Sequence, residues 1–170
     1  MIETERLLLR KPRLEDAPGL LEAFADPEAM RFIGDGSTTD LAGAEQAVRR
    51  WLERWSAWGI GMFVIEREED GRVLGRAGFL RWDPETWEIG GSETELGWGL
   101  AREHWGHGYA TEAALALRDW AFVEHGFTRL VSLIHPDNLP SIRVAEKVGE
   151  RHERDVEVRG NPTRLYSLAR

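Results

Sequence analysis

Apolar residues recur at steps of three and four positions in four stretches of the 170-residue chain, and this period predicts amphipathic helices. The second stretch shows it most clearly, because Val48, Trp51 and Trp55 fall on one helical face. A proline or a glycine follows each stretch, as is typical where a helix ends. The predicted helices cover residues 14–26, 42–59, 109–126 and 138–149.

Shorter apolar or alternating stretches predict seven strands. Asp70-Gly71 is a typical hairpin turn between two of them, and Gly160-Asn161-Pro162 separates the last two. The strands cover residues 6–12, 61–68, 73–82, 94–101, 129–136, 151–159 and 163–170. Because strands and helices are interspersed without a linker or repeat, we expect a single mixed α/β domain over residues 1–170.

The composition limits the classes of function that the protein can have. Hydrophobic residues make up 42% and charged residues 31%, which is ordinary for a globular protein, and the net charge of −8 argues against nucleic acid as a partner. The absence of cysteine excludes disulfides, a thiol nucleophile and thiolate metal sites. The charged N-terminal stretch is unlike a signal peptide, and no apolar run is long enough to span a membrane. We therefore expect a cytoplasmic protein.

The stretch HWGHGYATEA places two glycines directly before the predicted helix of residues 109–126. The first backbone N–H groups of a helix lack internal partners, and Gly106 and Gly108 would let the backbone approach a phosphate closely. Neither the P-loop pattern nor the dinucleotide-binding fingerprint matches. The loop alone is therefore compatible with an anion site or with glycines that only allow close packing.

The stretches ELGWGL, WGHGYATEA and HPDNLPSIRVAEKVG, together with the opening TERLLLRKPRLEDAPGLLE, resemble the GNAT acetyltransferase superfamily. In particular they look like the branch of the RimJ/RimL ribosomal-protein N-acetyltransferases. The resemblance implies one mixed, mostly antiparallel sheet of about seven strands, with helices on both faces and a splay between the fourth and fifth strands. One departure is Glu103, which stands where the superfamily commonly has glutamine or arginine.

The resemblance also implies acetyl-coenzyme A as co-substrate, with no metal. Three groups of residues would bind it: a loop for the pyrophosphate, a strand that pairs with the pantetheine arm, and an asparagine after the next strand. These are Gly106, His107, Gly108, Tyr109, Ala110 and Thr111; Trp98, Gly99 and Leu100; and Asn138. His104 and His107 lie close together, but no third metal ligand has a recognisable spacing.

Two side chains are candidates for proton transfer. Glu95 resembles a carboxylate that many family members use to deprotonate the amine, although it could equally be a structural strand residue. Ser141 stands where this branch often has a hydroxyl near the sulfur, although a serine at a helix start is often a cap. Glu93 is a weaker substitute for the base, and Tyr109 or Tyr166 for the acid.

The function implied by the resemblance is N-acetyl transfer from acetyl-coenzyme A to a primary amine by direct attack. The acceptor would be a protein N-terminus or a small-molecule amine, and a homodimer is a further expectation from the family. The alternative is a coenzyme A-binding module without activity. Trp51, Trp55 and Trp58 are either core residues or a wall of the acceptor pocket.

Overall fold

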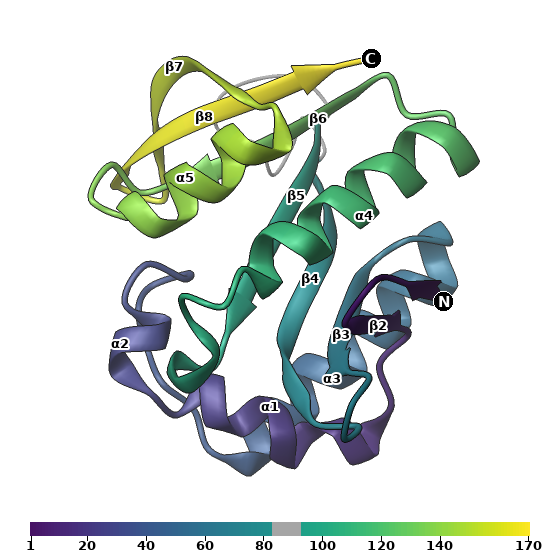
Figure 1. Ribbon diagram of the computed structural model, residues 1–170. Helices are drawn as coiled ribbons and strands as arrows, with labels where there is room; N and C mark the ends of the chain where they lie inside the picture. Colours follow the sequence, from purple (N-terminus) through teal and green to yellow (C-terminus); the bar gives the residue numbers. More distant parts are fainter. Residues whose placement is uncertain (83–92) are drawn as a thin grey trace.

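The computed structural model describes residues 1–82 and 93–170, and its centre is one eight-stranded sheet in the order β1-β2-β3-β4-β5-β6-β8-β7 (Figure 1). The strands are β1 (Ile2–Glu3), β2 (Leu7–Arg10), β3 (Met62–Arg67), β4 (Val73–Trp82), β5 (Glu93–Leu100), β6 (Arg129–Ile134), β7 (Arg151–Val158) and β8 (Asn161–Ala169). The predicted mixed sheet is confirmed. The eighth strand is β1, which has two residues and is too short to produce a period in the sequence.

All neighbouring strands pair antiparallel except β5 and β6, which are parallel. A single Cα pair, Glu95 with Val131, joins these two strands. Beyond this pair β5 and β6 diverge toward the left of the view in Figure 1. The fourth and fifth predicted strands correspond to β5 and β6, so the expected splay lies where the sequence resemblance placed it.

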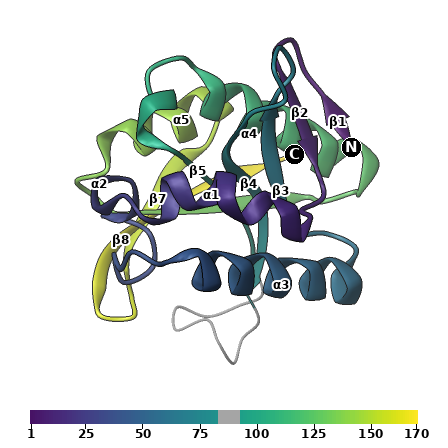
Figure 2. The same cartoon turned by 90° about the horizontal axis from the view of Figure 1, so that it is seen from below.

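The helices are α1 (Ala17–Phe24), α2 (Pro27–Met30), α3 (Leu41–Trp58), α4 (Tyr109–Glu124) and α5 (Leu139–Val148). Alternate residues of β3 show which helices cover each face of the sheet. Met62 and Val64 pack in a cluster with residues of α1 and α3, whereas Phe63 and Ile65 pack in a cluster with residues of α4. Figure 2 shows α1 and α3 below the sheet and α4 and α5 above it. Because successive side chains of a strand point to opposite faces, one strand contributes to both cores.

The tryptophan stripe of α3 divides between core and surface. Trp51 and Trp55 are buried, and the indole of Trp55 donates a hydrogen bond of 2.7 Å to the Met62 carbonyl and packs edge-on against Phe63. Trp58, in the last turn of α3, is 39% exposed. The core alternative is therefore correct for Trp51 and Trp55.

Two local predictions differ from the structure. The first helix ends before Asp26, as expected, but the short helix α2 begins directly afterwards. It begins there because the Asp26 carboxylate accepts the Glu28 N–H and Pro27 suits a first helical position. In the last hairpin, Arg159 and Gly160 have φ of 52° and 76° and form the turn. Asn161 therefore begins β8 and pairs with Val158.

Within residues 1–82 and 93–170, no helix is long and apolar enough to cross a membrane.

Candidate active site

The loop between β5 and α4 presents a row of free backbone amides. Gly106 and Gly108 both have positive φ, at 80° and 84°, and Gly108 is the N-cap of α4 without a side-chain cap. The first helical hydrogen bond of α4 runs from the Glu112 N–H to the Gly108 carbonyl. Among the described residues, the amides from Gly106 to Thr111 donate no hydrogen bond to protein. They form a suitable cradle for an anion.

Residues near the N-terminus hold this cradle in place. Glu112 in the first turn of α4 accepts hydrogen bonds from the Thr4 hydroxyl at 2.6 Å and from the Arg6 backbone and side chain at 2.9 and 2.8 Å. Burial opposes ionisation, yet these hydrogen bonds outweigh it and lower the pKa of Glu112. Arg6 also donates to the His107 carbonyl at 3.0 Å and lies 4.6 Å from the centre of the Tyr109 ring. This clamp joins positions 106 residues apart, so no local sequence pattern predicts it.

The gap between β5 and β6 exposes part of the β5 backbone. The Ala101 N–H donates to the Leu74 carbonyl on β4, so the alternation of the ladder directs the backbone groups of Trp98 and Leu100 away from β4 and into the gap. The Leu100 carbonyl is already used, because it accepts the Trp105 indole N–H at 2.9 Å. The backbone of Gly99 points to β4. Of the three predicted residues, Trp98 therefore offers both its N–H and its carbonyl to a ligand, and Leu100 offers its N–H.

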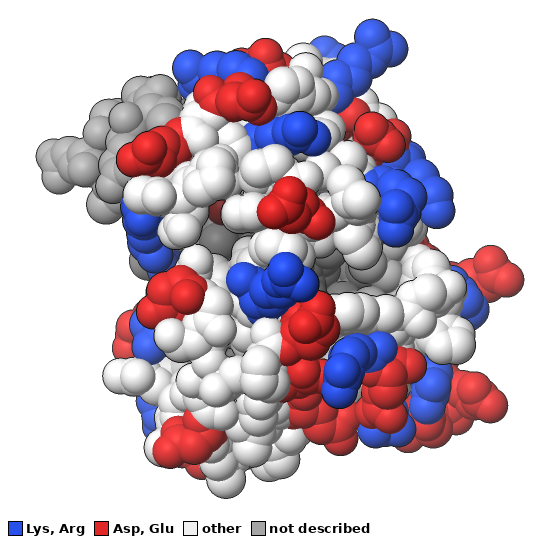
Figure 3. Space-filling view, turned by 90° about the vertical axis from the view of Figure 1, so that its left-hand side faces the viewer, with Lys and Arg blue, Asp and Glu red and all other residues white. Residues whose placement is uncertain are grey.

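Figure 3 views the molecule from the side on which β5 and β6 diverge and shows a hollow between an upper and a lower part of the surface. Mostly uncharged atoms surround the hollow, and acidic and basic side chains lie on its rims. The hollow thus lies on the side of the molecule where β5 and β6 diverge.

Glu95 lies at the end of the parallel contact, on the face of β5 that also carries Gly97 and Gly99. Its carboxylate accepts the Trp82 indole N–H at 2.7 Å. Burial raises the pKa of Glu95 to about 7, although the Trp82 hydrogen bond and the charge of Arg76 act in the opposite direction. Glu93, the substitute candidate, forms an ion pair of 3.2 Å with Arg129, so its carboxylate is already engaged by a cation.

The start of α5 lies beyond the end of β6. Asn138 is the N-cap, and its side-chain oxygen accepts the Ser141 N–H at 3.3 Å. The alternative that Ser141 itself caps the helix is therefore wrong. The Ser141 side chain is partly buried, and within the described part of the chain its hydroxyl makes no hydrogen bond. It remains available to a ligand.

A family model described as an acetyltransferase (GNAT) domain matches residues 6–151. The chain belongs to the GNAT acetyltransferase family. The uncharacterized N-acetyltransferase p20 of Bacillus licheniformis is 32% identical over 150 residues, which cover 88% of this chain and 82% of p20. A crystal structure of an acetyltransferase from Agrobacterium tumefaciens has a TM-score of 0.82 and 32% identity, and the match covers 99% of this chain and 94% of that one.

RimL, a ribosomal L7/L12 N-acetyltransferase whose structure was solved with coenzyme A, has a TM-score of 0.81 to this GNAT protein. The match covers 98% of this chain and 95% of RimL, but the identity is only 16%. This likeness shows a shared fold. The expected RimJ/RimL branch stays a prediction.

A second polar pair lies inside the GNAT core and was not predicted. Glu150 is 2% exposed, and its carboxyl group accepts the Ser132 hydroxyl at 2.9 Å, while the same hydroxyl lies 2.7 Å from the Leu96 carbonyl. The second carboxyl oxygen of Glu150 has no partner among the described residues. Burial, with a smaller effect of the Glu95 charge, raises the pKa of Glu150 to about 7. Ser132 thereby links β6 to β5 across the gap.

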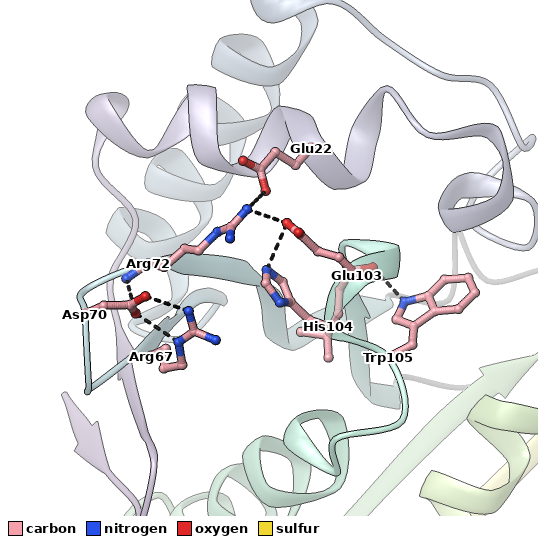
Figure 4. A network of polar contacts seen from close by, with 8 residues as sticks. Glu22, Arg67, Asp70, Arg72, Glu103, His104 and Trp105 are labelled. Carbon is pink, nitrogen blue, oxygen red and sulfur yellow. Dashed lines mark hydrogen bonds and ion pairs between the residues drawn. The ribbon is translucent and has the colours of Figure 1, made fainter.

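One cluster in the described residues has the geometry of a possible metal site, namely Glu22, Glu103 and His104. Figure 4 shows that the Arg72 guanidinium bridges the two carboxylates, with a distance of 3.1 Å to Glu22, and that His104 faces Glu103 at 3.5 Å. Since the Arg72 cation already pairs with both acids, we interpret the cluster as an ion-pair network. This network also explains the position of the Glu103 side chain, which pairs with Arg72 instead of facing the amide cradle. His107 takes no part in it.

Proposed function

We propose that this GNAT protein is an N-acetyltransferase that moves the acetyl group of acetyl-coenzyme A to a primary amine by direct attack. The observation that carries the proposal is the carboxyl group of Glu95, which has a pKa of about 7 and lies on the strand that exposes the Trp98 backbone in the gap. A base with a pKa near the working pH is well matched to accepting a proton from an attacking amine.

The described residues fit coenzyme A. The unbonded amides of Gly106–Thr111 suit a pyrophosphate, and the backbone groups of Trp98 suit the amide-rich pantetheine arm, as in the addition of a strand to a sheet edge. Asn138 retains its side-chain N–H groups for the same ligand. When bound, acetyl-coenzyme A supplies an activated acetyl group as a thioester.

The proton transfers are assigned to two side chains. An alkylammonium group has a pKa of about 10, so the acceptor must lose a proton before or during attack, and Glu95 accepts it. The Trp98 N–H is directed into the gap and would stabilise negative charge on the thioester oxygen. Ser141 would donate a hydrogen bond to the departing thiolate, since its hydroxyl is otherwise unused.

The test of the base is Glu95→Gln, with Glu93→Gln on the same strand as the matched control. Thiol release from acetyl-coenzyme A is followed with a panel of amines between pH 5.5 and 9. We expect the rate of the unmodified protein to rise through a pKa near 7, because the ionised carboxylate is the active form. Glu95→Gln should lower kcat by about 10²-fold or more and remove this rise.

Coenzyme A affinity is measured by calorimetry on the same variants and should not change. A Glu95→Gln variant with full activity and an unaltered pH profile would exclude Glu95 as the base. Binding of coenzyme A without thiol release on any amine would instead indicate the module without activity.

The cradle is tested separately with Gly106→Ala and Gly126→Ala. Both glycines have positive φ, at 80° and 66°, and at both an added Cβ meets no atom within 4 Å, so the backbone strain is comparable. Only Gly106 lies in the proposed pyrophosphate loop; Gly126 follows the other end of α4. We expect weaker coenzyme A binding for Gly106→Ala alone. Equal affinity of both variants would argue against this placement of the pyrophosphate.

A further inference from the structure

A guanidinium group lies beside Glu95 on the face of the sheet that α1 and α3 cover. Arg76 on β4 is the cross-strand neighbour of Gly99 on β5, and both lie on the same face as Glu95 and Gly97. Arg76 is partly buried. Neither glycine has a side chain, so the Arg76 head group lies over bare backbone: its Cζ is 3.8 Å from the position that a Cβ of Gly99 would occupy.

The surroundings of Arg76 supply no negative partner in contact. Its Nη1 atom has one weak acceptor, the Met62 sulfur at 3.8 Å, and the Ile33 side chain lies over the same position above Gly99. Across residues 1–82 and 93–170, no carboxylate lies within 4.0 Å of this guanidinium. The charge of Glu95 acts from a greater distance and raises the pKa of Arg76. Burial lowers the pKa of Arg76, as expected for a charge without a counterion.

Other arginines of the sheet differ from Arg76 because they have acidic partners. Three of these, Arg10, Arg67 and Arg129, form ion pairs of 3.2 Å or less with acids. A partly buried charge that lacks a partner destabilises the protein unless another role retains it. A bidentate anion would satisfy the planar head group of Arg76.

We propose that Arg76 binds the carboxylate of the acceptor, so that the substrates are small amino carboxylates such as free amino acids. This inference rests on the proposed function, because it concerns the acceptor of the same transfer. Arg76 would be a binding and specificity residue, while Glu95 would accept the proton.

The geometry supports one small molecule that spans both groups. Arg76 Nη1 lies 4.0 Å and Glu95 Oε1 lies 3.8 Å from the same point, the position of a Cβ on Gly97. The two charged groups therefore flank a common space over bare backbone without forming an ion pair themselves. In an α-amino acid a single carbon separates the amine from the carboxylate, so its amine can face Glu95 while its carboxylate faces Arg76.

The experiment compares each of a set of amino acids with its own carboxamide, which keeps the amine and side chain but removes the negative charge. Thiol release gives kcat and KM for the unmodified protein and for Arg76→Met, Arg76→Lys and the control Arg81→Met. Arg81 lies on the same strand but is exposed. Methionine keeps an unbranched side chain without the charge, and circular dichroism and thermal unfolding check that the variants fold.

We expect the unmodified protein to prefer the carboxylate over the carboxamide by about 10- to 100-fold in kcat/KM, the range for a hydrogen bond to a charged group. Arg76→Met should remove this preference, mainly through a higher KM for the carboxylates, with both substrate sets assayed at pH 9 because loss of the Arg76 charge raises the pKa of Glu95. Arg76→Lys should restore part of it, and Arg81→Met should retain it fully.

Equal activity on carboxylates and carboxamides in the unmodified protein would overturn the role of Arg76 while leaving amine acetylation in place. So would an equal loss on both substrate sets in Arg76→Met, and so would activity confined to peptide N-termini or polyamines. If no amine of any kind releases thiol, the proposed function itself fails, and the inference fails with it.

Discussion

The buried carboxyl group of Glu150 should make the stability of the protein depend on pH. Its pKa is about 7 in the folded protein, against an ordinary value of 4.5. Below pH 4.5 both states are protonated, so the group costs nothing. As the pH rises from 4.5 to 7, the unfolded chain releases the proton first and stability falls; above pH 7 the loss is complete.

The size of the effect follows from the same values. Each tenfold change in acidity corresponds to about 1.4 kcal/mol, so the full cost is about 3 kcal/mol. Most of it, about 2 to 3 kcal/mol, falls between pH 5 and pH 8. Glu150→Gln keeps an oxygen that can accept the Ser132 hydroxyl but cannot titrate, and it should therefore remove this part of the pH dependence.

The assay is urea unfolding of the unmodified protein, Glu150→Gln and Glu146→Gln at pH 5 and pH 8. Glu146 is an exposed residue of α5 and serves as the control. The change in the free energy of unfolding between the two pH values is compared, so that any constant cost of the glutamine cancels. If Glu150→Gln lost as much stability as the unmodified protein between pH 5 and pH 8, the reasoning about the buried carboxyl group would be refuted.

Three other variants test neighbouring contacts. Trp82→Phe removes the hydrogen bond to the Glu95 carboxylate, so the pKa of Glu95 should rise further and the acid limb of the rate profile should move to higher pH. Ser141→Ala should lower kcat by about tenfold without weakening coenzyme A binding in calorimetry. Glu112→Gln removes the negative charge that pairs with Arg6 and should lower the unfolding free energy by about 1 to 2 kcal/mol in urea titrations. Unchanged values would contradict each assignment.

The sequence pattern predicts much of the fold because most elements are long enough to show a period. The stripe of α3 repeats over 18 residues, and its start and end carry a capping aspartate and a glycine. The differences lie in short elements: β1 has two residues and α2 has four. The final turn moved by one position because Arg159 adopts a positive φ, which its type gives no reason to expect.

The glycine loop of the candidate site was predictable because it is local: Gly106, Gly108 and the start of α4 are adjacent in the sequence. The burial of Glu150 and the isolation of Arg76 were not, since both depend on strand pairing. Glu150 meets Ser132 only after β6, α5 and β7 have packed, and Arg76 meets the glycines of β5 through the ladder with β4. In the sequence, no local pattern distinguishes Glu150 or Arg76 from the exposed charged residues around it.

The sparse pairing of β5 with β6 has a consequence for how the protein fluctuates. Among the described residues, few polar contacts join β5 to β6: one Cα pair, the contact of the Ser132 hydroxyl with the Leu96 carbonyl, and the ion pair of Glu93 with Arg129. Before a ligand enters, this seam offers few hydrogen bonds that must break for the two parts to separate, so amides along it should exchange with solvent sooner than those of β3 and β4. A co-substrate that bonds to Trp98 on one side and to α5 on the other would slow exchange on both parts at once.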